Sequence, residues 1–242
     1  MKRRILVVAF LLLLSLPVQS LAAVRDFPAR VVLSKGKLAL YVARFRIMTV
    51  PNVGSSKAAL DSFRDKINAL WRRGVHLRYL RLARDGIKYQ NSYILKVRKS
   101  WVTYHKSESK WLVLKWGNNL YKALSILQAG YSRGGRYYRQ VGLASWYGYR
   151  WTGRRTSSGE RFNHMELTAA SRTLPFNSVV MVTNLSNYKS VIVRITDRGP
   201  YYKKRIIDLS EAAAYLIGML HSGVKRVKVE VILWNDRVGG ER

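Results

Sequence analysis

The sequence predicts an α+β N-terminal region followed by a closed barrel built mostly of β-strands. Two observations predict this class. Before residue 131, two segments with helical periodicity lie among short strand-like runs. From residue 141 onward, short alternating runs dominate, and one helical segment interrupts them. About a hundred residues of short strands suit a closed barrel, because closure leaves no exposed sheet edge.

The first 23 of the 242 residues have the pattern of a secretory signal peptide. Three cations precede an apolar run, and small residues end the segment at Ala22 and Ala23. The alternative is an uncleaved membrane anchor, against which the apolar run is short. We therefore expect secretion across the inner membrane to the periplasm or cell envelope, with no stable membrane anchor after cleavage.

The chain contains no cysteine, which excludes thiolate nucleophiles, cysteine zinc sites and disulfides. It also excludes a lipid-bearing cysteine, so we expect a protein that is not lipidated. An exported chain without disulfides is typical of a bacterial envelope. The four histidines are too far apart to form a metal pair on one helix, and no phosphate-binding loop occurs. No metal site and no cofactor are expected.

Residues 24–128 are expected to form a basic α+β accessory domain. Residues 31–47 alternate well enough for one or two strands around a turn at Lys35, and a loop with Pro51 and Gly54 follows. A helix is predicted from Ser55 or Ser56, because apolar residues recur at helical spacing until Gly74.

The second half of the accessory domain is predicted to be three strands and a helix. The strands are expected within 79–84, 86–89 and 92–104, with turns between them. The helix is expected from near Ser109 to Gly130, with one apolar stripe. Residues 129–140 are rich in glycine and arginine, which is typical of a linker.

Most of the positive charge belongs to the accessory domain and the linker. Of a net charge of +31, residues 24–140 carry +20, from 25 basic and 5 acidic side chains. A solvated basic face is the simplest interpretation, and a dedicated anion site is the alternative. In a protein with a signal peptide, we expect this positive charge to attract anionic polymers of the cell envelope. Nucleic acid is an unlikely partner there.

Residues 141–234 are expected to form the barrel, and 235–242 a tail. Strands are predicted at 141–148, 178–184, 190–197 and 224–232 from their alternation or apolar content. The helix is predicted over 211–220, with Ser210 as its N-cap and Gly223 after its end. Asp208 is expected to fix the start of this helix.

Six short motifs within the barrel carry a resemblance to a known family. They are G-x-A-S-W-Y-G at 142–148, T-S-S-G-E-R-F at 156–162, L-T-A-A-S-R-T-L-P-F at 167–176, V-T-N at 182–184, D-R-G-P at 197–200 and R-I-I-D-L-S at 205–210. In this order and spacing they resemble the rare lipoprotein A (RlpA) family. The resemblance implies a six-stranded double-psi β-barrel and cleavage of peptidoglycan glycan strands, preferentially those without stem peptides.

The family's acidic pair falls on Glu160 and Asp197, and its usual histidine is replaced here by Ser171. The resemblance implies that Asp197 is the acid and base of a lytic transglycosylase, in which the C6 hydroxyl of the muramic acid attacks C1. Glu160 is expected either to keep Asp197 protonated by its negative charge or to stabilise the oxocarbenium-like centre. The acid role requires Arg194 and Arg198 to point away from Asp197, or the site to be partly dry, because a neighbouring cation favours the ionised form. The alternative for Asp197 is a turn residue that accepts backbone amides.

Five further residues are candidates for binding the substrate: Tyr147, Ser171, Asn184, Arg198 and Tyr201. Tyr147 is either barrel core or a groove residue that stacks on sugars. Asn184 either binds an acetamido group or caps the turn after its strand.

The predicted function is therefore an exported endolytic peptidoglycan transglycosylase that releases 1,6-anhydro products. The alternative is a non-catalytic, expansin-like peptidoglycan-binding protein, which the replacement of histidine by Ser171 favours. A nucleic-acid binder rests only on charge and on the composition of the linker.

Overall fold

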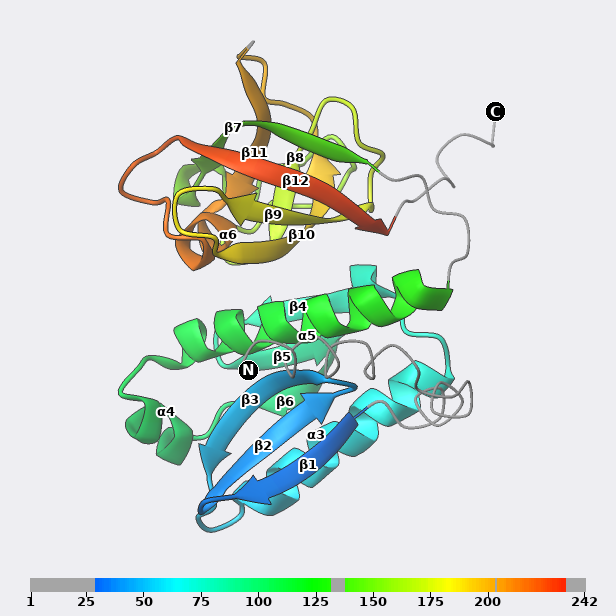
Figure 1. The fold of residues 1–242 in the computed structure, drawn as a ribbon, viewed down its shortest axis with the longest axis vertical. Helices are drawn as coiled ribbons and strands as arrows, with labels where there is room; N and C mark the ends of the chain where they lie inside the picture. The colour runs from blue at the N-terminus through cyan, green and yellow to red at the C-terminus, as the bar shows by residue number, and fades with distance from the viewer. Residues whose placement is uncertain (1–28, 132–137, 203, 234–242) are drawn as a thin grey trace, which may run out of the picture.

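The computed structural model describes residues 29–131, 138–202 and 204–233. Figure 1 shows a barrel on one side of a long helix, α5, and two small sheets on the other side. The predicted class, an α+β region followed by a six-stranded barrel, is confirmed. The expected signal peptide at 1–23 and the tail at 235–242 lie outside the described residues.

The first sheet contains β1 (Ala29–Ser34), β2 (Lys37–Val42) and β3 (Phe45–Pro51), all antiparallel. The predicted turn between the first two strands is present, with Lys35 and Gly36 at φ of 49° and 69°. A third strand occupies 45–51, where the sequence indicated only the end of a strand and then a loop. It forms because Ile47, Met48 and Val50 are buried in the shared core.

Helix α3 (Ser56–Arg72) confirms the predicted first helix. Its buried apolar residues are Leu60, Phe63 and Ile67, which follow the helical period of the sequence. The chain leaves the helix through Gly74 at φ of 78°, a conformation that glycine adopts without steric cost.

The second sheet contains β4 (Leu80–Ala83), β5 (Gly86–Tyr89) and β6 (Ser92–Lys96), preceded by a 3-10 turn at Leu77–Tyr79. The prediction that the last strand continues to residue 104 was wrong, because residues Lys99–His105 form helix α4. Aromatic and β-branched residues favoured a strand here. Tertiary burial decided otherwise: Trp101 is fully buried and its Nε1 donates to Ser56 Oγ at 2.9 Å.

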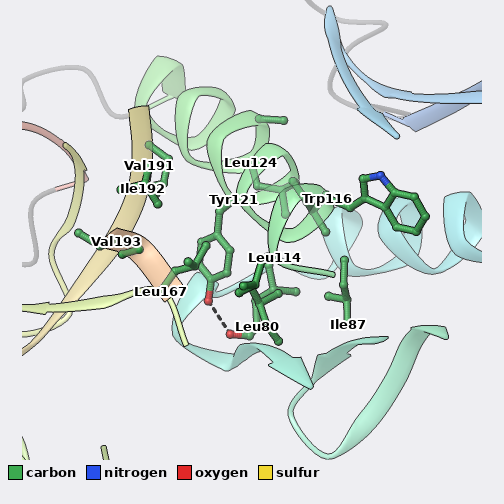
Figure 2. Packing of buried hydrophobic residues seen from close by; sticks show 14 of the residues in the cluster. Leu80, Ile87, Leu114, Trp116, Tyr121, Leu124, Leu167, Val191, Ile192 and Val193 are labelled. Atoms are coloured by element: carbon green, nitrogen blue, oxygen red, sulfur yellow. Dashed lines mark hydrogen bonds between the residues drawn. The ribbon is translucent and has the colours of Figure 1, made fainter. Parts of the chain in front are cut away.

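Helix α5 (Ser109–Tyr131) confirms the second predicted helix and joins the two halves of the molecule. Figure 2 shows Tyr121 reaching the carbonyl of Leu80 on β4, and the barrel residues Val191 to Val193 lie beside the same helix. Asn118 Oδ1 accepts from the amide of Ile192 at 2.9 Å. The N-terminal region is thus packed against the barrel. Within the described residues, no helix combines the length and apolar content needed to cross a membrane.

The barrel contains six strands in the closed order β10-β8-β11-β7-β12-β9. Their bounds are β7 (Arg139–Tyr147), β8 (Thr168–Ala170), β9 (Val179–Asn184), β10 (Ser190–Asp197), β11 (Arg205–Ser210) and β12 (Lys225–Leu233). The pairs β10–β8 and β11–β7 are parallel, and the other four are antiparallel. A short 3-10 turn, η2 (Tyr149–Trp151), follows β7.

Helix α6 (Glu211–Leu216) lies between β11 and β12 and is shorter than predicted. Ser210 is its N-cap, as expected, and its Oγ accepts from the amide of Ala213 at 3.3 Å. The helix ends before Gly218, which has a φ of 67°. Its buried residues Ala212, Ala213 and Ala214 face the core.

Candidate active site

Four barrel strands place a row of small and acidic residues side by side. Asp197 on β10 pairs with Ala170 on β8, and Ala170 pairs with Asp208 on β11. Asp208 in turn pairs with Ser145 on β7. Residues directly opposite each other on neighbouring strands point to the same face of a sheet. The strand register therefore directs both aspartates to one face, although they are eleven positions apart in the sequence.

Asp197 ends β10 and is held by three hydrogen bonds to a single oxygen. Its Oδ1 accepts from the amide of Ser157 at 2.8 Å, from Ser157 Oγ at 2.7 Å and from the amide of Arg198 at 2.8 Å. Within the described residues, Oδ2 accepts no hydrogen bond and the carboxyl forms no ion pair. The carboxyl therefore has a fixed orientation and one unoccupied oxygen. The backbone contacts resemble those of the turn alternative, but they leave Oδ2 available.

Both arginines near Asp197 in the sequence point elsewhere, as the acid role requires. Arg198 Nη1 donates to the carbonyls of Ser171 and Leu174, each at 3.0 Å, and its guanidinium lies 3.6 Å from the centre of the Phe176 ring. Arg194 is turned toward Glu160. Neither cation neutralises the Asp197 carboxylate directly.

Glu160 is held in a two-pronged ion pair by Arg194. Arg194 Nη1 donates to Oε1 at 2.6 Å and Nη2 donates to Oε2 at 2.8 Å. Arg81 from β4 approaches Oε2 at 3.5 Å. Burial alone would raise the pKa of Glu160, but the hydrogen bond and charge of Arg194 outweigh it, and Arg81 and Arg78 act in the same direction. The pKa of Glu160 therefore lies below its usual value. Because Arg194 compensates its charge, Glu160 is poorly suited to keep the proton on Asp197.

One tight turn connects the two candidate carboxylates. Thr156 donates its amide to the carbonyl of Glu160 at 2.8 Å, and the turn passes through Gly159 at φ of 87°. The amide of Ser158 donates to the carbonyl of Thr196 at 3.2 Å, which ties the turn to β10. Glu160 thus anchors one end of the turn through Arg194, and Ser157 in the same turn holds Asp197.

Ser171, at the position of the family's histidine, is 2% exposed. Its Oγ accepts from the amides of Thr173 and Leu174 at 3.4 and 3.3 Å, and its own amide donates to the carbonyl of Asp197 at 3.1 Å. These contacts use the hydroxyl to close a turn. They give Ser171 a structural task next to Asp197 and no contact with the Asp197 carboxyl.

Tyr147 lies at the end of β7, half-buried, with its ring stacked on Phe162 at 4.3 Å between centroids. Burial and then the charges of Asp197 and Asp208 hold its pKa well above the usual value, against a smaller opposing contribution from Thr168. The Tyr147 hydroxyl therefore stays neutral close to both aspartates, and its oxygen is buried without a hydrogen-bond partner among the described residues.

The other two candidates differ in exposure. Tyr201 is 78% exposed, beside the turn that follows Asp197. Asn184 is 1% exposed. Its Nδ2 donates to the carbonyl of Ile217 and its Oδ1 accepts from the amide of Ser186, both at 2.9 Å. The turn-capping alternative therefore describes Asn184, and only Tyr201 of this pair can reach a ligand without rearrangement.

Sequence reasoning assigned Asp208 to the helix start, and the structure corrects this. Ser210 caps the helix, whereas Asp208 Oδ1 accepts from Ser145 Oγ and its Oδ2 lies 3.7 Å from Arg205 Nη2. Alternation within R-I-I-D-L-S would have shown that Asp208 faces away from the barrel core, where Ile207 and Leu209 are buried. Ser157 lies within the motif at 156–162 but was not singled out as a site residue, and Arg81 lies in no motif. In the part of the chain that the structure describes, no group of three or more His, Asp or Glu side chains is arranged to hold a metal ion.

The second acidic residue beside Arg81 gives a testable pH effect. Burial raises the pKa of Glu166 above its usual value of 4.5, against the charges of Arg81 and Arg194. A raised folded-state pKa contributes stability at low pH that is lost as the pH rises through that pKa. We expect Glu166→Gln to increase the free energy of unfolding at pH 7.5 and to leave it nearly unchanged at pH 4, measured by urea denaturation. Glu108→Gln, at an exposed carboxyl, serves as control; a Glu166→Gln protein less stable at pH 7.5 would contradict the expectation.

Comparison with known proteins shows what the barrel is similar to. Residues 139–229 match the family model described as lytic transglycolase. The endolytic peptidoglycan transglycosylase RlpA of Pseudomonas aeruginosa is 56% identical over 97 residues, which cover 40% of this chain and 28% of the relative. The protein of the same description from Neisseria meningitidis is 53% identical over 96 residues, 40% of each chain. The solved expansin of Clavibacter michiganensis matches with a TM-score of 0.32 and 16% identity, over 42% of this chain and 53% of the expansin. The chain spans less than half the length of both curated relatives.

Proposed function

We propose that this protein is an exported lytic transglycosylase of the cell envelope, because residues 139–229 match the lytic transglycolase family model and are similar to RlpA proteins. Its substrate would be the glycan strand of peptidoglycan, cleaved between N-acetylmuramic acid and N-acetylglucosamine to leave 1,6-anhydro ends. The observation that carries the proposal is the Asp197 carboxyl, with Oδ1 held by three donors and Oδ2 unoccupied by any described residue.

Asp197 would act first as acid and then as base. The proton on Oδ2 passes to the glycosidic oxygen as the bond from that oxygen to C1 of the muramic acid breaks. Positive charge develops at C1, and the C6 hydroxyl of the same sugar attacks it. The hydroxyl proton then returns to Asp197, so that the reaction consumes no water and restores the enzyme. A single properly oriented carboxyl is sufficient for this cycle.

Glu160 would act through geometry. Its ion pair with Arg194 anchors the turn that contains Ser157, and Ser157 fixes Asp197. We assign Glu160 as a positioning residue. The part of its negative charge that Arg194 does not compensate would also stabilise the positive charge that develops on the sugar. Tyr147 and Tyr201 are proposed to contact the sugars. Arg198 would support the wall of the groove from its contact with two carbonyls.

The second candidate is a wall-binding protein without turnover. Ser171 favours it, since a buried hydroxyl that closes a turn cannot replace an imidazole. Another imidazole in the barrel, His164, has its Nδ1 2.8 Å from Thr152 Oγ1 and its ring against Tyr149.

One assay separates the two candidates. Purified residues 24–242 are incubated with peptide-free glycan strands, and the products are examined by mass spectrometry. We expect fragments with 1,6-anhydromuramic ends. Stable binding to the strands without any new fragment would overturn the enzymatic proposal in favour of the wall-binding protein.

A further inference from the structure

A groove in the accessory domain lies between helix α3 and strand β6. It has a volume of about 420 Å³ and is outside the barrel. On the helix side its lining is small, with Ala58, Ala59 and Ser62. Small side chains leave space that a ligand with short side chains can enter. We call this feature the α3–β6 groove.

Among the residues that the structure describes, the α3–β6 groove is lined by three cations and by no acidic residue. The cations are Lys66, Lys96 and Arg98. Neutral groups hold all three: Lys66 Nζ donates to the carbonyl of Tyr93 at 3.3 Å, Lys96 Nζ lies 4.6 Å from the Tyr93 ring centre, and Arg98 Nη1 donates to Ser55 Oγ. None of the three forms an ion pair with another described residue. Their positive charge is therefore uncompensated, and the groove attracts anionic groups.

The strand side of the α3–β6 groove is an open sheet edge. Within residues 29–131, 138–202 and 204–233, β6 is the last strand of its sheet and pairs only with β5. Four consecutive residues, 93–96, line the groove. Successive side chains of a strand point to opposite faces, so a groove lined by four in a row runs along the strand and its edge. An open edge binds an extended peptide through main-chain hydrogen bonds.

We propose that the α3–β6 groove binds a short, extended peptide bearing carboxylates. The identity of the peptide rests on the proposed function: it would be a stem peptide of peptidoglycan, which combines small alanine side chains with free carboxylates. The cations match the carboxylates, the open edge matches the peptide backbone, and the small helix residues match the short side chains. The accessory domain would thus hold the protein on peptide-bearing wall while the barrel cleaves bare glycan nearby.

Binding of a fluorescein-labelled synthetic stem tetrapeptide, L-Ala-D-Glu-diaminopimelate-D-Ala, tests the proposal by fluorescence anisotropy at low salt. The groove variant is Lys66→Glu with Lys96→Glu. The matched control is Lys115→Glu with Lys189→Glu, two exposed lysines outside the groove with the same change in charge. We expect the groove variant to bind about tenfold more weakly or worse and the control to bind like the wild type. Circular dichroism verifies that both variants are folded.

Several outcomes would overturn the proposal. Equal weakening in both variants would indicate attraction by net charge alone. Equal binding of a peptide with amidated carboxyls would exclude carboxylate recognition. Absence of peptide binding, with retention on phosphatidylglycerol vesicles that the groove variant loses, would assign the groove to a membrane surface. The Asp197→Asn protein should bind the peptide normally. If the wild type forms no anhydro products and yet binds the peptide through the groove, only the proposed enzymatic function fails.

Discussion

Asp197→Asn is expected to reduce the formation of anhydromuramic ends at least about a hundredfold, the usual scale for removing a general acid. The asparagine keeps the size of the side chain and still accepts hydrogen bonds from Ser157 and Arg198 through its carbonyl oxygen. It cannot supply or recover the proton. The measurement is the rate of product release from peptide-free glycan strands, followed by mass spectrometry.

Controls must show that Asp197→Asn impairs the catalytic step and leaves the fold and the binding of glycan strands unchanged. Glu108→Gln makes the same chemical change at an exposed carboxyl of the accessory domain and should leave the rate unchanged. Strand binding by the Asp197→Asn protein should also persist, because the proposed sugar contacts, Tyr147 and Tyr201, are unchanged. A variant that still released anhydro products at the wild-type rate would show that Asp197 is not the acid.

Removal of the Glu160 carboxyl is expected to lower the free energy of unfolding by about 3 kcal/mol, because it leaves a buried cation unpaired. Arg194 is 2% exposed and keeps only Asn177 Oδ1, at 3.0 Å, as a side-chain partner in the described structure. Glu160→Ala should also slow catalysis, since the turn that places Ser157 on Asp197 loses its anchor. Urea denaturation measures the first effect, and product release measures the second.

Two further variants test whether the loss of stability in Glu160→Ala comes from the unpaired charge of Arg194. Glu160→Met with Arg194→Met removes both charges, so it should recover much of the stability lost in Glu160→Ala, because no buried ion remains unpaired. Lys57→Met breaks an exposed ion pair with Asp61 and should cost less than about 1 kcal/mol. If Glu160→Ala were no more costly than Lys57→Met, the buried pair would not have the stabilising part assigned to it.

Local sequence patterns predicted the longer elements of this chain well. Helices α3 and α5 follow apolar stripes at helical spacing, and Ser210 caps α6 by its local hydrogen bond. The errors occurred where burial overruled local preference. The segment around Trp101 has strand-forming residues but is a helix, since the indole fills the core beside Ser56. β8 has three residues, which is too short for any alternation to be recognised.

The candidate site was predictable in its residue types and only partly in its geometry. The motifs located Asp197 and Glu160, and the structure gives Asp197 an unoccupied oxygen. They could not show that Arg194 would pair with Glu160 and leave Asp197 alone, because side-chain direction depends on strand register. The motifs also did not show that Asp208 lies on the same face as Asp197, because β8 pairs with the strands of both residues.

By itself the sequence determined the resemblance of the barrel to the RlpA family, the identity of the candidate acid and the excess of positive charge before the barrel. These depend on residue identity, order and spacing, which need no coordinates. Only the tertiary structure decided which cation neutralises which carboxylate, that Ser171 and Asn184 are buried, and that the accessory domain reaches Glu160 through Arg81. The contacts of Glu160 with Arg194 and Arg81 join residues 34 and 79 positions apart in the sequence. The strength of an ion pair or hydrogen bond falls within a few ångströms, so folding alone sets such contacts.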